Sequence, residues 1–202
     1  MRITDIKANV NDKSRVSVYI DNKFAFALNQ QSLLASKIYK SEEIDAKRLA
    51  ELKKLADFDK LYFRTLTYVT SRLKTRWQVK VYLEKKDASP ALIEAILNKL
   101  SDINLIDDYN YALSYISDRN QLRPTSLTKI KFDLLKKHID SNVVVKAIED
   151  SDLDNSSSLR QVIATKRRQL RYKDDQKLMQ YLARQGYNYG EIKEALQENL
   201  ES

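Results

Sequence analysis

VKVYLEKKDASPALIEAIL (79–97), IKFDLLKKHIDSNVVVKAI (130–148) and LMQYLARQGYNYGEIKEAL (178–196) are three segments of this chain that align without gaps. Each one has apolar residues at helical spacing on both sides of a short polar corner. Self-similarity at a period of about 50 residues is typical of helical repeat proteins. Each segment therefore predicts two helices joined by a tight turn.

The corners of the three segments carry Asp87, His138 and Gly186 at the same aligned position. These residue types tolerate the left-handed backbone conformation that often ends a helix. The corner thus accounts for the single histidine of the chain without any chemistry. Ser89 and Pro90 likewise indicate a helix start, with a serine cap and a proline in the first helical position, and not a reactive serine.

A further helical segment precedes each pair: LYFRTLTYVTSRL, DDYNYALSYISDRN and SLRQVIATKRRQLR. The repeating unit is therefore three helices, and we place the three units at 58–106, 107–155 and 156–202. Since a unit of this size buries little surface alone, we expect the units to stack into an elongated, curved solenoid. The acidic, serine-rich stretch 149–158 is the expected flexible joint between the second and third units.

The N-terminal region 1–57 has a different pattern. ITDIKANV, RVSVYI and FAFALN alternate apolar and polar residues, with NDKS and DNK between them, which predicts a small antiparallel β meander. QQSLLASKI then predicts a short helix. SEEIDAKRLAELKKLADF predicts a longer one, with Ser41 as N-cap and Glu42 and Glu43 in its first turn. The fold class is mainly α with this small β meander at its start.

Two adjacent carboxylates, Asp107 and Asp108, stand where the first helix of the second unit is expected to begin. Such a pair could serve acid/base or metal chemistry, but only with several further convergent groups. At a helix start Asp107 fits an N-cap, Asp108 adds favourable charge to the first turn, and Ile106 can pack on Tyr111. We interpret the pair as structural.

The composition argues against an enzyme. The 202 residues include no cysteine, one histidine and two glycines. Thiolate chemistry, multi-histidine metal sites and glycine-rich nucleotide loops are therefore excluded, and we expect neither cofactor nor metal. The start of the chain lacks the apolar core of a signal peptide, and no apolar run approaches about 18 residues. We expect a cytoplasmic protein that does not enter membranes.

A formal charge of +8 indicates an anionic partner, although a basic protein can also simply be soluble. TSRLKTRWQVK (70–80) contains the only tryptophan, Trp77, which could stack on a base or partner, or pack between helices. ATKRRQLRYK (164–173) has the highest local density of arginine.

Lys85, Lys136 and Arg184 align near the end of each middle helix, where a cation also favours the helix dipole. The candidate contact residues are Arg72, Lys74, Arg76, Trp77, Lys85, Arg123, Lys129, Lys136, Lys137, Lys166, Arg167, Arg168, Arg171, Lys173 and Arg184.

The sequence resembles the RecX family of bacterial regulators of the RecA recombinase over nearly its whole length. LSDINLIDDYNYALSYISDR (100–119) is similar to a family stretch with two aspartates and an aromatic-alanine pair, and RPTSLTKIKFDLLKKHID (123–140) to its basic turn and corner. RVSVYIDNKFAFALN followed by SEEIDAKRLAEL resembles the longer, low-G+C Gram-positive branch. The chain departs from the family at the usual corner glycine, which is Asp87 and His138 here, and at the glycine of the basic turn, which is replaced within RPTSL.

The resemblance implies a modulator without catalysis of its own. Members of the family bind the RecA filament on single-stranded DNA and curb its ATP hydrolysis, strand exchange and co-protease activity, in homologous recombination, DNA repair and the SOS response. It also implies that the protein bridges neighbouring protomers, with salt-sensitive affinity for single-stranded DNA and weaker affinity for double-stranded DNA. Because stacked repeats can be self-sufficient, we expect a monomer. The alternative is a basic helical-repeat DNA-binding protein that acts by sequestering single-stranded DNA.

Overall fold

The computed structural model describes residues 1–9, 12, 14–151 and 153–198. The chain forms two compact units. The first comprises Met1–Arg72 and Tyr82–Leu105, and the second comprises Leu73–Val81 and the chain from Ile106 onward. The division passes through helix α3 (Arg76–Glu84), whose first residues belong to the second unit.

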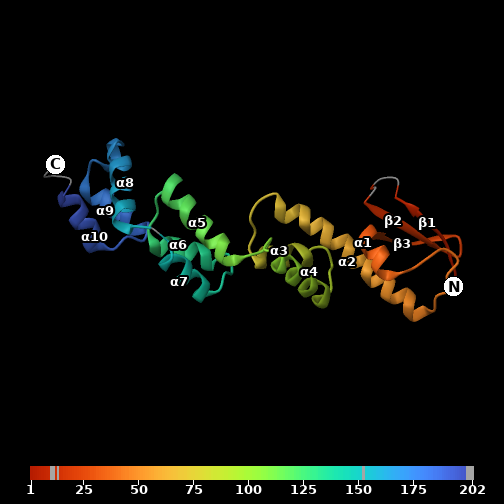
Figure 1. Ribbon diagram of the computed structural model, residues 1–202. Helices are drawn as coiled ribbons and strands as arrows, with labels where there is room; N and C mark the ends of the chain where they lie inside the picture. The colour runs from red at the N-terminus through yellow and green to blue at the C-terminus, as the bar shows by residue number, and fades with distance from the viewer. Residues whose placement is uncertain (10–11, 13, 152, 199–202) are drawn as a thin grey trace. The chain divides into compact units, whose positions relative to one another are not determined.

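The predicted β meander is confirmed. Strands β1 (Ile3–Ala8), β2 (Arg15–Ile20) and β3 (Lys23–Asn29) form one antiparallel sheet in the order β1-β2-β3 (Figure 1). Asp21 and Asn22 join β2 to β3 with φ angles of 47° and 63°, as a two-residue hairpin of the favoured twist requires. Residues 10, 11 and 13, in and beside the first predicted turn, lie outside the described residues.

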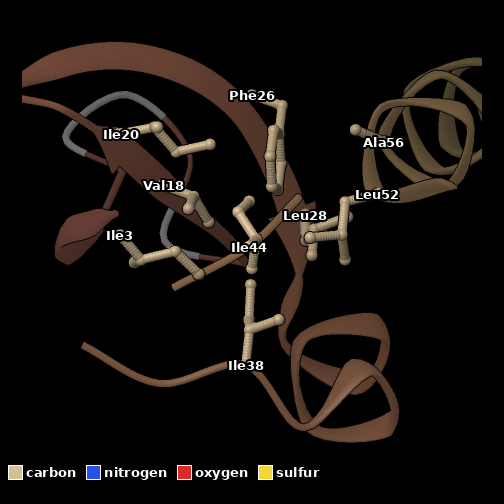
Figure 2. Close-up of a cluster of buried hydrophobic side chains, with 9 residues drawn as sticks. All are labelled: Ile3, Val18, Ile20, Phe26, Leu28, Ile38, Ile44, Leu52 and Ala56. Atoms are coloured by element: carbon tan, nitrogen blue, oxygen red, sulfur yellow. The ribbon is translucent and has the colours of Figure 1, made fainter. Parts of the chain in front are cut away.

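The sheet buries its apolar residues against the chain that follows it. Helix α1 (Gln30–Ser36) comes directly after β3, and α2 (Ala46–Thr70) covers the sheet with Leu52 and Ala56, one helical turn apart. Figure 2 shows the side chains of this core pointing toward one another. They are Ile3, Val18, Ile20, Phe26, Leu28, Ile38, Ile44, Leu52 and Ala56.

The prediction that Ser41 caps the second helix is wrong. Asp45 is the N-cap of α2, and its side chain accepts a hydrogen bond of 2.6 Å from the backbone N–H of Arg48. Glu42 and Glu43 consequently lie outside the helix. The N–H of Ser41 donates to the carbonyl of Ile3 instead, so this segment lies along the edge of the sheet.

Helix α2 continues through position 57, where the sequence suggested a boundary between the N-terminal region and the first repeat. Nothing in DFDKL (57–61) breaks a helix. Asp59 also ties the middle of α2 to the sheet, since its buried carboxylate accepts from the Asn29 N–H and the Ser32 hydroxyl, each at 2.9 Å. The last part of α2 then supplies the helix that precedes α3 and α4 (Pro90–Asp102).

The second and third repeats lie in the second unit and have the predicted helices. Those of the second repeat are α5 (Asp108–Leu122), α6 (Leu127–Leu135) and α7 (Ser141–Glu149). Those of the third are α8 (Asn155–Arg167), the short 3-10 helix η1 (Leu170–Tyr172), α9 (Asp175–Arg184) and α10 (Tyr189–Glu198). Each repeat has its own buried apolar cluster. The mainly helical fold class is thus confirmed, whereas the curved solenoid and the repeat boundaries stay predictions.

The stretch 149–158 has more regular structure than a joint requires. The side chain of Asp154 caps α8, and residues 155–158 form the first turn of that helix. Ser158 is fully buried. Asp152 lies outside the described residues, and the predicted flexibility of the stretch stays a prediction.

The three corners adopt the predicted backbone conformation. Asp87, His138 and Gly186 have φ angles of 57°, 59° and 88°. Ser89 also caps α4 as expected, with Pro90 in its first turn. The aligned residues therefore occupy equivalent structural positions.

Neighbouring repeats are joined by a contact that occurs twice within the second unit. The Thr75 hydroxyl, just before α3, donates to the Lys137 carbonyl at 3.2 Å, and the Ser126 hydroxyl, just before α6, donates to the Gln185 carbonyl at 2.5 Å. Both hydroxyl residues are fully buried, and both acceptors directly precede a corner. The cap of one middle helix thus binds the corner of the following repeat.

The first helix of the following repeat completes each of these junctions. Asp108, at the start of α5, accepts from the Arg76 N–H at 2.8 Å. Asn155, at the start of α8, accepts from the Leu127 N–H at 3.1 Å. In α3 and α6, an N-terminal N–H that has no acceptor within its own helix is thereby satisfied by a side chain from the next repeat.

Candidate basic and aromatic interface

The second unit has an open hollow that brings together predicted contact residues from two repeats. Its walls come from the start of α3, from α5 and from the end of α6. The lining residues are Trp77, Gln78, Tyr115, Arg119, Asp133, Lys136 and Lys137. Sequence reasoning selected the tryptophan and both lysines, but it did not bring them together.

Trp77 has one of the two roles that the sequence left open, because it packs against another side chain of the chain. Its ring stacks on the imidazole of His138 with centroids 4.0 Å apart and planes 20° from parallel. The side chain is nevertheless 39% exposed. His138 therefore holds the indole in place from one side, while part of the ring remains available to a partner.

Tyr115 organises the polar side of the hollow. Its hydroxyl donates to the Asp133 carboxylate at 2.9 Å and accepts from the Arg119 guanidinium at 2.7 Å. Burial is the main reason that the pKa of Tyr115 is raised, so the phenol stays protonated and can donate. Because the Asp133 carboxylate offsets the charge of Arg119, the lysines give the hollow its net positive charge.

Those two lysines lie against aromatic rings. The ammonium of Lys137 is 5.6 Å from the Tyr111 ring centre and 5.5 Å from that of Tyr115. The ammonium of Lys136 is 4.3 Å from the Phe132 ring centre, and Phe132 is itself exposed. Such cation–π contacts hold long side chains in place. The hollow therefore presents fixed cations beside aromatic surface.

The arginine-rich stretch 164–173 divides into structural and exposed cations. Arg167 pairs with the Asp175 carboxylate and donates to the Lys173 carbonyl at 2.9 Å, so it holds the turn between α8 and α9. Lys166 lies 4.8 Å from the Tyr181 ring centre. Arg168, Arg171 and Lys173 are exposed and remain candidates for partner contact.

The three aligned cations lie at equivalent places, as predicted. Lys85 directly follows α3, Lys136 is the C-cap of α6, and Arg184 is the last residue of α9; all three are exposed. Lys129 has a structural role, because its ammonium donates to the Gln185 side chain at 2.7 Å in the second junction.

The remaining candidates differ in exposure. Arg72 and Arg123 are exposed in loops, and Arg76 is half-buried at the start of α3. Lys74 is only 5% exposed, contrary to what a surface contact requires. The stretch 70–80 therefore contributes fewer accessible cations than its sequence suggests, because Lys74 is buried next to the equally buried Thr75.

A second hollow, in the first unit, was missed by the sequence reasoning. Lys60, Arg64 and Lys86 line it together with the carboxylates of Asp57 and Asp87. Two of these cations lie one helical turn apart in α2, a spacing that could have indicated a shared face. The mixed charges make this surface less clearly suited to an anion than the hollow beside Trp77.

The double aspartate is structural, as predicted. Asp107 is the N-cap of α5 and accepts from the N–H groups of Tyr109 and Asn110 at 2.9 and 3.0 Å. Burial raises the pKa of Asp108, which lies in the first junction. In the part of the chain that the structure describes, no three acidic, histidine or cysteine side chains gather as a metal site would require. Over the same residues, no helix is both long and apolar enough to cross a membrane.

The fold and this surface define a mainly helical protein with repeated helical units and a basic, aromatic hollow. Residues 1–45 match the family model for the regulatory protein RecX N-terminal domain. The chain is 28% identical to the regulatory protein RecX of Clostridium acetobutylicum, over 97% of this chain and 95% of that protein. It is 29% identical to the RecX of Clostridium perfringens, over 93% and 91% of the two chains.

Solved structures agree with these similarities. A crystal structure of a regulatory protein RecX superposes with a TM-score of 0.77 at 25% identity, covering 95% of this chain and 97% of that one. The RecX structure from Lactobacillus salivarius gives a TM-score of 0.61 at 31% identity, over 70% of this chain and 96% of that one. The chain belongs to the RecX family of regulatory proteins.

Proposed function

We propose that this protein binds the RecA filament on single-stranded DNA and inhibits or modulates its ATPase, strand exchange and co-protease activities, without catalysis of its own. RecA modulation is the known role of the RecX family. The observation that carries the proposal beyond the family is the hollow beside Trp77, where fixed cations and an exposed indole converge. Tryptophan and arginine dominate the binding energy of many protein interfaces.

The chemistry of the hollow suits an acidic protein surface. Lys136 and Lys137 can pair with carboxylates, and the exposed part of Trp77 can cover an apolar side chain of the partner. Since Trp77 stacks on His138, Lys136 lies against Phe132 and Lys137 lies against Tyr115, little side-chain freedom is lost on binding. We propose that the protein acts in this way as a monomer in the cytoplasm.

A second candidate function is sequestration of single-stranded DNA. The exposed face of Trp77 could stack on a base, and the exposed cations Arg168, Arg171 and Lys173 could contact phosphates. On this account the affinity for DNA falls steeply with salt, and weaker binding to double-stranded DNA follows from the same charges.

The experiment that separates the two is the DNA-dependent ATPase of the cognate recombinase, with this protein added well below stoichiometry and the single-stranded DNA varied. Inhibition that persists in excess DNA supports action on the filament. Inhibition that disappears as DNA is added shows that the protein removes strands, and the second function then replaces the first.

A pair of variants on one helix tests the hollow itself. Lys136→Glu reverses a charge at the hollow, and Lys131→Glu reverses an exposed charge on the same helix outside it. We expect the first to raise the concentration for half-inhibition about tenfold, a typical effect of one well-placed interface charge, and the second to change it less than about twofold. Equal effects of the two variants would remove the hollow from the interface.

A further inference from the structure

An arginine occupies the same place in the first loop of each repeat. This loop joins the first helix of a repeat to its middle helix, and the arginine lies three residues before the residue that caps the middle helix. The three pairs are Arg72 with Thr75, Arg123 with Ser126, and Arg171 with Asp174. All three arginines are exposed.

An exposed leucine lies next to each of these arginines. Leu73, Leu122 and Leu170 are 58%, 75% and 86% exposed. Single exposed leucines are common on protein surfaces. Packing within this chain gives no reason for a leucine at three equivalent loops, because none of the three belongs to a buried cluster of the described residues.

The loops are also held in defined conformations. In the second repeat the N–H of Arg123 donates to the Arg119 carbonyl, and the Thr125 hydroxyl donates to the Arg123 carbonyl at 2.8 Å. In the third, the N–H of Gln169 donates to the Lys166 carbonyl at 2.9 Å, and η1 follows directly. In these two repeats the arginine and its leucine therefore lie in a short, hydrogen-bonded turn.

The pairing of a guanidinium with an isobutyl group identifies the kind of partner. A phosphate chain would bind the arginines but would gain nothing from three leucines kept in water. A protein surface with a carboxylate beside an apolar pocket would use both, since arginine binds carboxylates in a bidentate way and leucine fills such a pocket.

We propose that these three arginine–leucine loops (72–73, 122–123 and 170–171) are a repeated docking element for a partner built of identical subunits, each offering a carboxylate beside an apolar pocket. The inference rests on the proposed function, in which those subunits are successive protomers of the recombinase filament. One loop per repeat then contacts one protomer, and contacts linked in one chain multiply in their effect on affinity.

The test compares two triple variants of the full chain. The first is Leu73→Ser, Leu122→Ser and Leu170→Ser, and the control changes three exposed apolar residues outside the loops, Leu34→Ser, Ile103→Ser and Val145→Ser. The cognate recombinase filament on single-stranded DNA is the probe for binding and ATPase inhibition. Labelled single-stranded DNA alone is the probe for nucleic-acid affinity, and thermal unfolding checks that each variant is folded.

We expect the leucine triple variant to bind the filament at least about tenfold more weakly, with each single change weakening binding about two- to threefold. The control and the affinity for free DNA should change less than about twofold. If the wild-type chain inhibits the filament and the leucine variant inhibits it equally, the docking element is disproved while the proposed function stands. The same holds if the leucine variant loses affinity for free DNA to the same extent as it loses affinity for the filament. If the wild-type chain neither binds nor inhibits the filament, the proposed function itself fails.

Discussion

The hydroxyl oxygen of Ser126 lies 2.8 Å from the position that a β-carbon on residue Gly186 would occupy. Gly186 also has a φ of +88°, a conformation that residues with side chains rarely adopt. The junction between the second and third repeats therefore favours glycine for two reasons, the close contact and the backbone conformation. The junction made by Thr75 is longer, at 3.2 Å, and there the corner residue is His138.

Gly186→Ala should destabilise the second unit by about 1–3 kcal/mol, because the new methyl group strains the backbone and displaces a buried hydroxyl. Gly190 provides a matched control, since its added β-carbon would meet only the Asn188 side chain, at 3.3 Å. Gly190→Ala should change stability by less than about 0.5 kcal/mol. Urea denaturation followed by Trp77 fluorescence measures both, and equal losses would argue against a strained junction.

Asp107→Ala should lower the free energy of unfolding by about 1 kcal/mol, because two N–H groups at the start of α5 lose their acceptor. Asparagine is nearly as good a cap, so Asp107→Asn should retain most of the stability. Asp118→Ala, at an exposed position on the same helix, serves as the control. Loss of ATPase inhibition in a folded Asp107→Asn variant would contradict the structural role.

Stability near pH 4 should reveal the burial of Asp108. Burial raises the pKa of this carboxyl above its ordinary value of 3.8, so the folded state keeps a proton that the unfolded chain has already released. On account of this group, the free energy of unfolding falls as the pH rises from about 3.8 through the folded pKa.

Asp108→Asn removes that dependence and keeps an oxygen that can accept from the Arg76 N–H. The difference in unfolding free energy between variant and wild type should therefore shift in favour of the variant as the pH rises from 3.5 to about 6. Guanidinium denaturation across this range measures it. A difference that is independent of pH would show that Asp108 is well solvated.

Tyr187→Phe should leave stability unchanged or raise it by up to about 1 kcal/mol at neutral pH. The Tyr187 hydroxyl is buried and finds no hydrogen-bond partner among the described residues. Removing it takes away an unsatisfied polar atom and leaves the ring in the core. Tyr189→Phe, at a 65% exposed position, should have no effect.

The same variant has a signature at alkaline pH. Burial raises the pKa of Tyr187 to about 12, so the folded state resists an ionisation that the unfolded chain undergoes near 10. Wild-type stability should therefore fall as the pH rises above 10, and the fall between pH 7 and 10.5 should be smaller in Tyr187→Phe. An identical fall in both proteins would mean that the hydroxyl reaches water.

Local signals in the sequence predicted the corners and caps well. Asp87, His138 and Asp107 have their structural positions because of chemistry within a few residues of each one. Ser41 was misassigned because its position is set by a hydrogen bond to Ile3, which is far away in the chain. Periodicity carries no information about such contacts, and Asp45 offered an equally good cap four residues later.

The candidate site was predicted only in part, for a similar reason. Charge and composition identified Trp77 and Lys136 separately. These residues line one hollow with Tyr115 because the start of α3 packs against the second repeat. Alignment of the repeats gives no information about that packing. Lys74 shows the converse, because this cation of a basic stretch is buried in the folded chain.

The junctions also order events on the ribosome. The hydroxyl of Thr75 can form its bond only after the Lys137 carbonyl, 62 residues later, has been synthesised, and that of Ser126 only after the Gln185 carbonyl, 59 residues later. At a synthesis rate of roughly 5–20 residues per second, each cap spends about 3–12 s without its acceptor. A nascent chain of this protein thus gains its repeats in sequence, and each newly made corner completes the helix synthesised one repeat earlier.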